Sequence, residues 1–116
     1  MIIQEVADIL EAGIVARKDL AGREIVSACG SDMMSDVMAF FHGQGVLLTG
    51  LINVQAIRTV SLMDISAVCL VRGKKATQEM IDLAEEFEVV ILETRYPMFT
   101  ACGKLYERGL QGNNPD

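Results

Sequence analysis

The sequence is poor in the residues from which many metal and catalytic sites are built. It has one histidine, three cysteines and two prolines among 116 residues, and it contains no CxxC pair. An odd number of dispersed cysteines argues against a disulfide framework or a zinc site, and a lone histidine cannot build a metal centre. The P-loop pattern GxxxxGK[ST] is also missing, which argues against ATP hydrolysis of that type. We therefore expect no metal, no cofactor and no catalytic set.

Basic charge and long apolar runs are scarce as well. The formal net charge is −6 at pH 7, which argues against nucleic acid as a partner, because that binding depends on clustered lysine and arginine. No apolar run approaches the roughly 20 residues of a membrane helix. The first basic residue is Arg17, so the N-terminus does not read as a secretory signal. With free thiols that fit a reducing compartment, these features predict a cytoplasmic protein without a membrane partner.

What the sequence does contain is a unit that recurs in its middle and C-terminal parts. An apolar run is followed at once by a helical pattern in residues 46–64, 67–87 and 89–109. Runs that are apolar throughout indicate a parallel sheet covered on both faces, because an exposed face would produce alternation. We predict one α/β domain over residues 1–110, a three-layer sandwich with a mostly parallel central sheet. The polar residues 111–116 are predicted to be a frayed tail.

The first third of the chain is expected to add a helix and two strands. Helical spacing predicts a helix over Met1–Glu11, followed by a short edge strand over Ile14–Arg17. Alternation predicts a second strand over Arg23–Ser27. Ser31 fits the N-cap of the next helix, and Asp32 fits its first turn, where a carboxylate suits the helix dipole.

The later helices have clear start signals. Asn53 and Thr77 are predicted N-caps, and Pro97 fits the first turn of the last helix. The residues expected to face inward are Val54, Ile57, Val60, Leu62, Met80, Ala84, Phe87, Met98, Cys102, Leu105 and Tyr106. The apolar face of the last helix is unusually wide, so it is either deep core or a dimer contact.

The loops at the carboxyl ends of the predicted strands are the places to search for a ligand site. They comprise residues 49–53, 72–77 and 93–97. The first two combine a strand end, a glycine and a helix N-cap, where free amides attract anions. Plain turn chemistry is the simpler explanation of the same residues, because loops that connect a strand to a helix require glycines and caps whatever their function. The candidate ligand-binding residues are Thr49, Gly50, Asn53, Arg72, Gly73 and Lys74, with Lys75 as a further nearby cation.

Other singled-out residues have simple structural interpretations. His42 is expected to be a solvated turn residue rather than a general base. Acidic residues that gather on one predicted helix form either a solvated face or a docking surface for a basic partner. These are Glu79, Asp82, Glu85, Glu86 and Glu88. The thiols of Cys29, Cys69 and Cys102 have apolar neighbours and are predicted to be buried.

Three segments carry a family resemblance. SDMMSDV (31–37), LLTG (47–50) and YPMFTACGKLY (96–106) resemble small stand-alone DRTGG-domain proteins, which are similar to the N-terminal domain of HPr kinase/phosphorylase. The resemblance covers residues 21–110, although the letters DRTGG do not occur in the sequence. It implies an α/β sandwich like the N-terminal domains of HPr kinase and Mur ligases, without the phosphotransfer domain. In related proteins such modules accompany phosphotransacetylase or CBS domains as regulatory or dimerising parts.

These inferences predict a non-catalytic regulatory or ligand-sensing domain that forms a homodimer. It would bind a small anionic metabolite, such as a nucleotide or an acyl-phosphate, or a protein partner. A second hypothesis is a small transferase or hydrolase that acts on a phosphorylated metabolite through the loops at Thr49 and Lys74. A third is a structural dimerisation or adaptor module that acts through the acidic helix.

Overall fold

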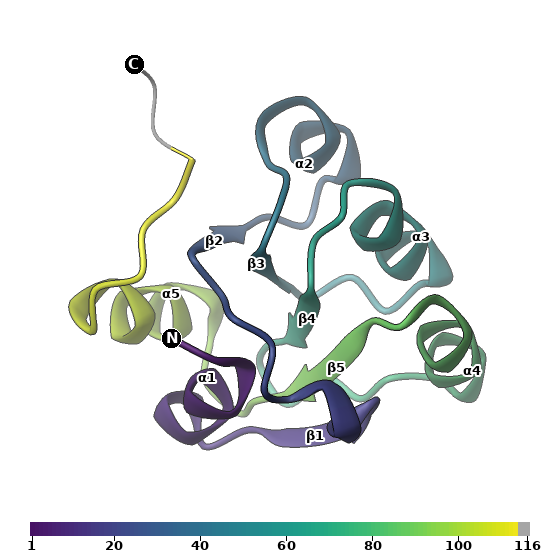
Figure 1. The fold of residues 1–116 in the computed structure, drawn as a ribbon, viewed down its shortest axis with the longest axis horizontal. Helices are drawn as coiled ribbons and strands as arrows, with labels where there is room; N and C mark the ends of the chain where they lie inside the picture. The colour runs from purple at the N-terminus through teal and green to yellow at the C-terminus, as the bar shows by residue number, and fades with distance from the viewer. Residues whose placement is uncertain (114–116) are drawn as a thin grey trace.

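Four parallel strands, each beside the one before it in the chain, form the centre of the molecule (Figure 1). The structure is a computed structural model and describes residues 1–113. The sheet order is β1-β5-β4-β3-β2, with β1 antiparallel to β5 and the other neighbours parallel. The α/β class predicted from the repeated units is confirmed. The strands are β1 (Gly13–Ala16), β2 (Ser27–Gly30), β3 (Gly45–Thr49), β4 (Ala67–Leu70) and β5 (Val90–Glu93).

Helices cover both faces of this sheet (Figure 1). Helices α2, α3 and α4 connect successive parallel strands and pack on one face, because such crossovers share one handedness. Helices α1 and α5 pack on the other face. A single 3-10 turn, η1, follows β1. The helical bounds are α1 (Ile3–Leu10), η1 (Lys18–Leu20), α2 (Met34–Phe40), α3 (Val54–Leu62), α4 (Gln78–Phe87) and α5 (Met98–Glu107).

The central strands are buried on both faces, as their continuous apolar runs predicted. In β3, the side chains of Val46 and Leu48 belong to the cluster under α1 and α5, and Leu47 belongs to the cluster under α2, α3 and α4. All three are fully buried. Burying a side chain of this size stabilises a fold by about 1.5–3 kcal/mol. Successive side chains of β3 therefore contribute to the apolar clusters on the two opposite faces of the sheet.

The strand predicted over Arg23–Ser27 begins four residues later than expected. The observed strand is β2, and the residues before it form only an isolated bridge between Ile2 and Glu24. The misleading alternation comes from Ile25, which is 1% exposed in the core cluster under α1 and α5, and Val26, which is 59% exposed. A buried Ile25 next to an exposed Val26 therefore gave this extended segment the same alternation as a half-buried strand.

Some side chains predicted to face inward point to solvent instead. Leu62 is 69% exposed because it follows Val60 by two residues, which turns it by about 200° around the helix. Phe87, the last residue of α4, is also exposed. Pro97 is the N-cap residue of α5 and not a first-turn residue, since its backbone is extended at φ −65° and ψ 162°.

No helix within residues 1–113 is both long enough and apolar enough to cross a membrane. The same residues hold no group of three or more histidine, cysteine or acidic side chains that would suit a metal ion. Of the predicted tail, Gln111 lies beside Ser27 of β2, and the Asn113 side chain accepts a hydrogen bond from the amide of His42. Residues 114–116 of that tail lie outside the described residues.

Candidate functional site

The carboxyl ends of β2, β3, β4 and β5 meet at one edge of the sheet, since these strands are parallel. The connection after β4 leads to α4 on one face, and the connection after β5 leads to α5 on the opposite face (Figure 1). Adjacent strands whose connections leave in opposite directions define a topological switch point, where ligands bind in α/β proteins. The loops after β4 and β5 are therefore the centre of the candidate site.

The loop after β3 is held by a carboxylate from the neighbouring strand end. Oδ1 of Asp32 accepts a hydrogen bond of 3.0 Å from the Thr49 hydroxyl and one of 2.6 Å from the Gly50 amide. The Thr49 hydroxyl oxygen also accepts from the amide of Leu51 at 3.2 Å. Asn53 is the N-cap of α3, as predicted, and accepts from the amide of Gln55 at 2.7 Å. Much of the hydrogen-bonding capacity of this loop is already used within the protein.

Ser31 and Asp32 do not have the roles that helix capping predicted. The N-cap of α2 is Met33, and the Ser31 hydroxyl oxygen accepts a hydrogen bond from the Met33 amide at 3.0 Å before the helix begins. Asp32 bonds to β3 and its loop instead of the helix, because the parallel strand ends place it beside Gly50. The sequence signal for this contact was a carboxylate shortly after one strand, Asp32, together with Thr49 and Gly50 at the end of the next strand.

The loop after β4 is joined to the loop after β5 by two backbone hydrogen bonds. The amide of Arg72 donates to the carbonyl of Tyr96 at 2.8 Å, and the amide of Gly73 donates to the carbonyl of Thr94 at 2.9 Å. Arg72 and Gly73 both adopt left-handed backbone conformations, with φ of 59° and 73°. A non-glycine residue is unfavourable in this region, so the paired loops hold Arg72 in place.

A second internal carboxylate serves the same loop after β4. Oε2 of Glu93 accepts from the amide of Ala76 at 2.8 Å, and Oε1 lies 3.5 Å from the Lys75 ammonium group. Thr77 is the N-cap of α4, as predicted, and accepts from the amide of Met80. Glu93 therefore occupies a position where an external anion would otherwise meet Ala76 and Lys75.

The structure brings only some of the six predicted ligand-binding residues together. Arg72 lies against Gly50: a Cβ atom added to Gly50 would be 2.7 Å from Nη2 of Arg72. The amides of Gly50 and Gly73 and the side chain of Asn53 already have partners. Lys74 is exposed. The guanidinium of Arg72 and the ammonium group of Lys74 are the charged donors that this predicted set offers to a ligand.

A surface cleft of about 440 Å³ lies at the same edge of the sheet, lined by Leu10, Glu11, Arg95 and Tyr96. The Tyr96 hydroxyl donates a short hydrogen bond to the Glu11 carboxylate, and this bond raises the pKa of Tyr96. The ammonium group of Lys104 lies 4.8 Å from the centre of the Tyr96 ring. Residues 93–97 were one of the loops predicted to be near a ligand, but Glu11, Arg95 and Tyr96 were not among the predicted ligand-binding residues.

Thr94 fixes the wall of this cleft from within. Its hydroxyl donates to the carbonyl of Leu10 at 2.7 Å and accepts from the amide of Tyr96 at 3.3 Å. Thr94 is 1% exposed, so these bonds are shielded from water. They connect the end of α1 to the loop after β5, and the Gly73 amide extends the connection to the loop after β4.

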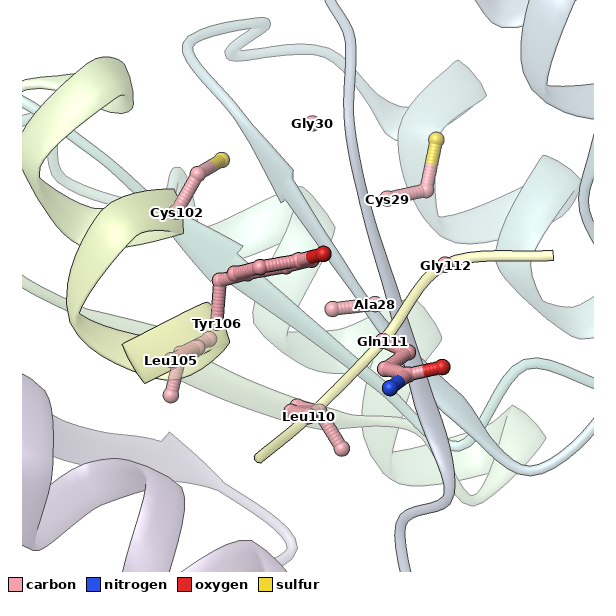
Figure 2. A pocket seen from close by; sticks show the side chains of 9 residues that line it. All are labelled: Ala28, Cys29, Gly30, Cys102, Leu105, Tyr106, Leu110, Gln111 and Gly112. Carbon is pink, nitrogen blue, oxygen red and sulfur yellow. The ribbon is translucent and has the colours of Figure 1, made fainter. Parts of the chain in front are cut away.

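A smaller hollow of about 150 Å³ lies between β2, α5 and residues 110–112, as Figure 2 shows. Cys29 and Cys102 line it from opposite sides of β2, and each is half-buried. Only Cys69 is fully buried as predicted, and burial raises its pKa to about 12. Burial also raises the pKa of Cys29 and Cys102. A raised pKa disfavours the thiolate, which is the reactive form of a cysteine.

No protein-family model and no curated protein matches this chain. A solved structure that does resemble it contains the CBS and DRTGG domains of the regulatory region of Clostridium perfringens pyrophosphatase, complexed with an activator, diadenosine tetraphosphate. The TM-score is 0.74 at 15% sequence identity, over 89% of this chain and 45% of that chain. The chain shares a fold with part of that structure. This chain therefore spans less than half the length of its structural neighbour.

At this sequence identity the likeness establishes the fold alone. It confirms, at the level of the fold, the resemblance to regulatory regions that contain a DRTGG domain. The finer resemblance to the N-terminal domain of HPr kinase stays a prediction. The expected cytoplasmic location and homodimer also stay predictions.

Proposed function

We propose that this domain is a non-catalytic, ligand-sensing regulatory module that binds a small anionic metabolite at the carboxyl edge of its sheet. The ligand class is a nucleotide or an acyl-phosphate. The DRTGG-like, HPr kinase-related character expected from the sequence is part of this proposal. Its regulatory side is supported by the fold shared with the pyrophosphatase region, which was crystallised with a nucleotide activator.

The observation that carries the proposal is a gathering of cations without acidic partners on an acidic protein. The formal net charge of the chain is −6. Yet within residues 1–113, Arg72, Lys74 and Arg95 have no carboxylate oxygen within 4.0 Å. All three belong to the loops after β4 and β5, at the switch point of the sheet. Unpaired cations favour an anion through charge-assisted hydrogen bonds, and Arg95 also lines a cleft.

The loops also provide a way for binding to influence the rest of the domain. Arg72 contacts Gly50, whose amide is bound to Asp32, and its own amide is bound to the carbonyl of Tyr96. A ligand that shifts Arg72 would alter contacts at the ends of β2, β3 and β5. A ligand changes a conformational equilibrium only through such differences in contact.

The acidic residues of α4 give weaker support than the sequence suggested to the hypothesis of an adaptor that binds a basic partner. Glu85 of α4 accepts from the amide of Arg17 at 3.2 Å, and Asp82 accepts from the Gln78 side chain at 2.8 Å. Two of the five acids therefore have structural roles. The others remain a solvated face on which a basic partner protein is the second candidate.

A thermal-shift screen tests the proposal. We expect ADP, ATP, diadenosine tetraphosphate or acetyl phosphate to raise the melting temperature, since a ligand at 100 times its dissociation constant stabilises the native state by about 2.7 kcal/mol. For a domain of this size, that corresponds to a shift of roughly 10 °C or more. Product analysis of the same mixtures separates sensing from catalysis. Turnover that persists after repurification and is lost with a single loop substitution would favour the transferase or hydrolase hypothesis.

A further inference from the structure

We propose that the cleft between the end of α1 and the loop after β5 is a ribonucleoside phosphate site. Arg95 and Lys104 would hold the phosphate, Tyr96 would contact the base, and Glu11 would accept from the ribose hydroxyls. This inference rests on the proposed function and narrows both the ligand class and its position. It moves the site away from the loop residues that the sequence favoured.

The size and position of the cleft support this assignment. Its volume of about 440 Å³ falls within the range of about 300–1,000 Å³ that small-molecule sites occupy. It lies beside the switch point between β4 and β5, because Arg95 and Tyr96 follow β5 directly. Leu10 and Glu11 close the opposite wall from the end of α1.

Arg95 lines the cleft and is available to a phosphate, and Lys104 lies beside the cleft against Tyr96. Arg95 is exposed, and neither it nor Lys104 has a carboxylate oxygen within 4.0 Å in the part of the chain that the structure describes. The ammonium group of Lys104 lies over the Tyr96 ring at 4.8 Å from its centre. A guanidinium binds phosphate oxygens in a bidentate manner, and an ammonium group adds a point charge. In the proposed site Arg95 would hold the phosphate, and Lys104 would add a charge from its place over the Tyr96 ring.

The carboxylate of Glu11 makes a nucleotide a better ligand for the cleft than inorganic phosphate. Its Oε2 atom accepts from the Tyr96 hydroxyl, while Oε1 has no hydrogen-bond partner among residues 1–113. A carboxylate in a cleft disfavours inorganic phosphate through like-charge repulsion. Carboxylates of this kind accept hydrogen bonds from ribose hydroxyls in dinucleotide sites. The cleft thus matches a ligand that presents hydroxyl donors and an aromatic ring as well as a phosphate.

The predicted loops are less suited to hold the same ligand. The amides of Gly50, Gly73 and Ala76 already donate to protein acceptors. A phosphate bound there would have to displace the carboxylates of Asp32 and Glu93. The cleft requires no such exchange at Arg95 or Lys104.

Titration calorimetry with ADP tests the site. We expect Arg95→Ala and Lys104→Ala each to weaken ADP binding about tenfold or more, because each removes a charge-assisted contact. Lys74→Ala tests the competing position in the loop after β4. Arg58→Ala removes an exposed cation on α3 and is the matched control, which should change the dissociation constant less than about twofold. Glu11→Gln should reduce the preference for ADP over its dideoxy analogue. Circular dichroism melting of each variant verifies that the substitutions leave the fold intact.

The outcomes separate this inference from the proposed function. Loss of ADP binding in Lys74→Ala with none in Arg95→Ala would overturn the cleft assignment and leave the sensing function standing. Binding of acetyl phosphate or inorganic pyrophosphate without binding of ADP would do the same. If none of the screened anions bound to the wild-type protein, both proposals would fail.

Discussion

The hydroxyl of Thr94 donates a 2.7 Å hydrogen bond to the carbonyl of Leu10, although 84 positions separate the two residues. The bond joins the residue after β5 to the last turn of α1, on the face of the sheet covered by two helices. Thr94 and Leu10 are both buried. Water therefore cannot easily replace the bond, which adds to the buried packing of Ile3, Val6 and Leu10 in holding α1 against the sheet.

Thr94→Val should destabilise the domain by about 1–3 kcal/mol. The substitution keeps the shape of the side chain but leaves the Leu10 carbonyl without its buried donor. Thr94→Ser is the control, because it keeps the hydroxyl and removes one methyl group, at about 0.8 kcal/mol. Urea unfolding followed by circular dichroism gives both values. Equal losses in the two variants would show that the hydroxyl contributes little.

Asp32→Ala should lower the free energy of unfolding by about 1 kcal/mol. A pair of hydrogen bonds to a carboxylate is worth more than this when buried, but Asp32 is exposed and solvent reduces its contribution. Glu86→Ala, on the exposed face of α4, is the matched control and should stay within about 0.5 kcal/mol of the wild type. A variant with Asp32→Ala as stable as that control would contradict the role assigned to this carboxylate.

The Cys69 thiol should make stability depend on pH in the alkaline range. Its pKa rises from 9.0 to about 12 on folding, so the native state retains a proton that the unfolded chain loses. The stabilisation is complete below pH 9 and is lost as the pH rises towards 12. The free energy of unfolding should therefore fall by about 1.4 kcal/mol per pH unit in this window.

The comparison with Cys69→Ala isolates this contribution, because other groups titrate at the same pH. The variant should show a shallower alkaline slope, whatever its stability at neutral pH. Native labelling with a thiol reagent gives a second measurement. We expect Cys29 and Cys102 to react before Cys69, which should react only after unfolding. An early reaction of Cys69 would refute its burial.

The predicted homodimer should form through the outer face of α5. Phe99 is 89% exposed and Tyr106 is 69% exposed, and their spacing of seven residues places them on one side of the helix. Leu105, which the sequence also suggested as a contact, is 1% exposed and belongs to the core. Exposed large apolar groups of this kind mark interaction surfaces.

Light scattering at micromolar concentration should give the mass of a dimer, and Phe99→Ser with Tyr106→Ser should give the mass of a monomer. Leu62→Ser is the control, since Leu62 is as exposed as Tyr106 but lies on α3. A monomeric wild-type protein would contradict the dimer. A dimer unaffected by the two changes in α5 would place the contact elsewhere.

The fold could be predicted where the residues of a single segment are enough to determine its secondary structure. The runs at 46–48, 67–71 and 89–92 are apolar throughout, and only strands buried on both faces suit them. The capping oxygens of Asn53 and Thr77 act within their own helices, so local sequence located both helix starts. The local pattern around Ile25 wrongly predicted a strand. Ile25 is buried because it packs in the same core cluster as residues of α1, which are distant in the sequence.

The site was harder to predict because its contacts cross between strands. The partners of Asp32 lie 17 and 18 residues away, and that of Tyr96 lies 85 residues away. Sequence reasoning could name the strand-end loops, but it could not show that Asp32 and Glu93 already bind their amides. It also could not place Glu11 beside Tyr96, since this requires the antiparallel β1 to return the chain to the end of β5.

Both edges of the sheet are protected against adding further strands. At β1 the pairing with β5 shifts register between Ile14 and Ala16, and such irregular edges are poor templates for another chain. At β2 the carbonyl of Gln111 accepts a hydrogen bond from the outward amide of Ala28 at 2.8 Å. The addition of a strand from another molecule, which is the step that starts fibrillar growth, is therefore hindered at each edge of the sheet.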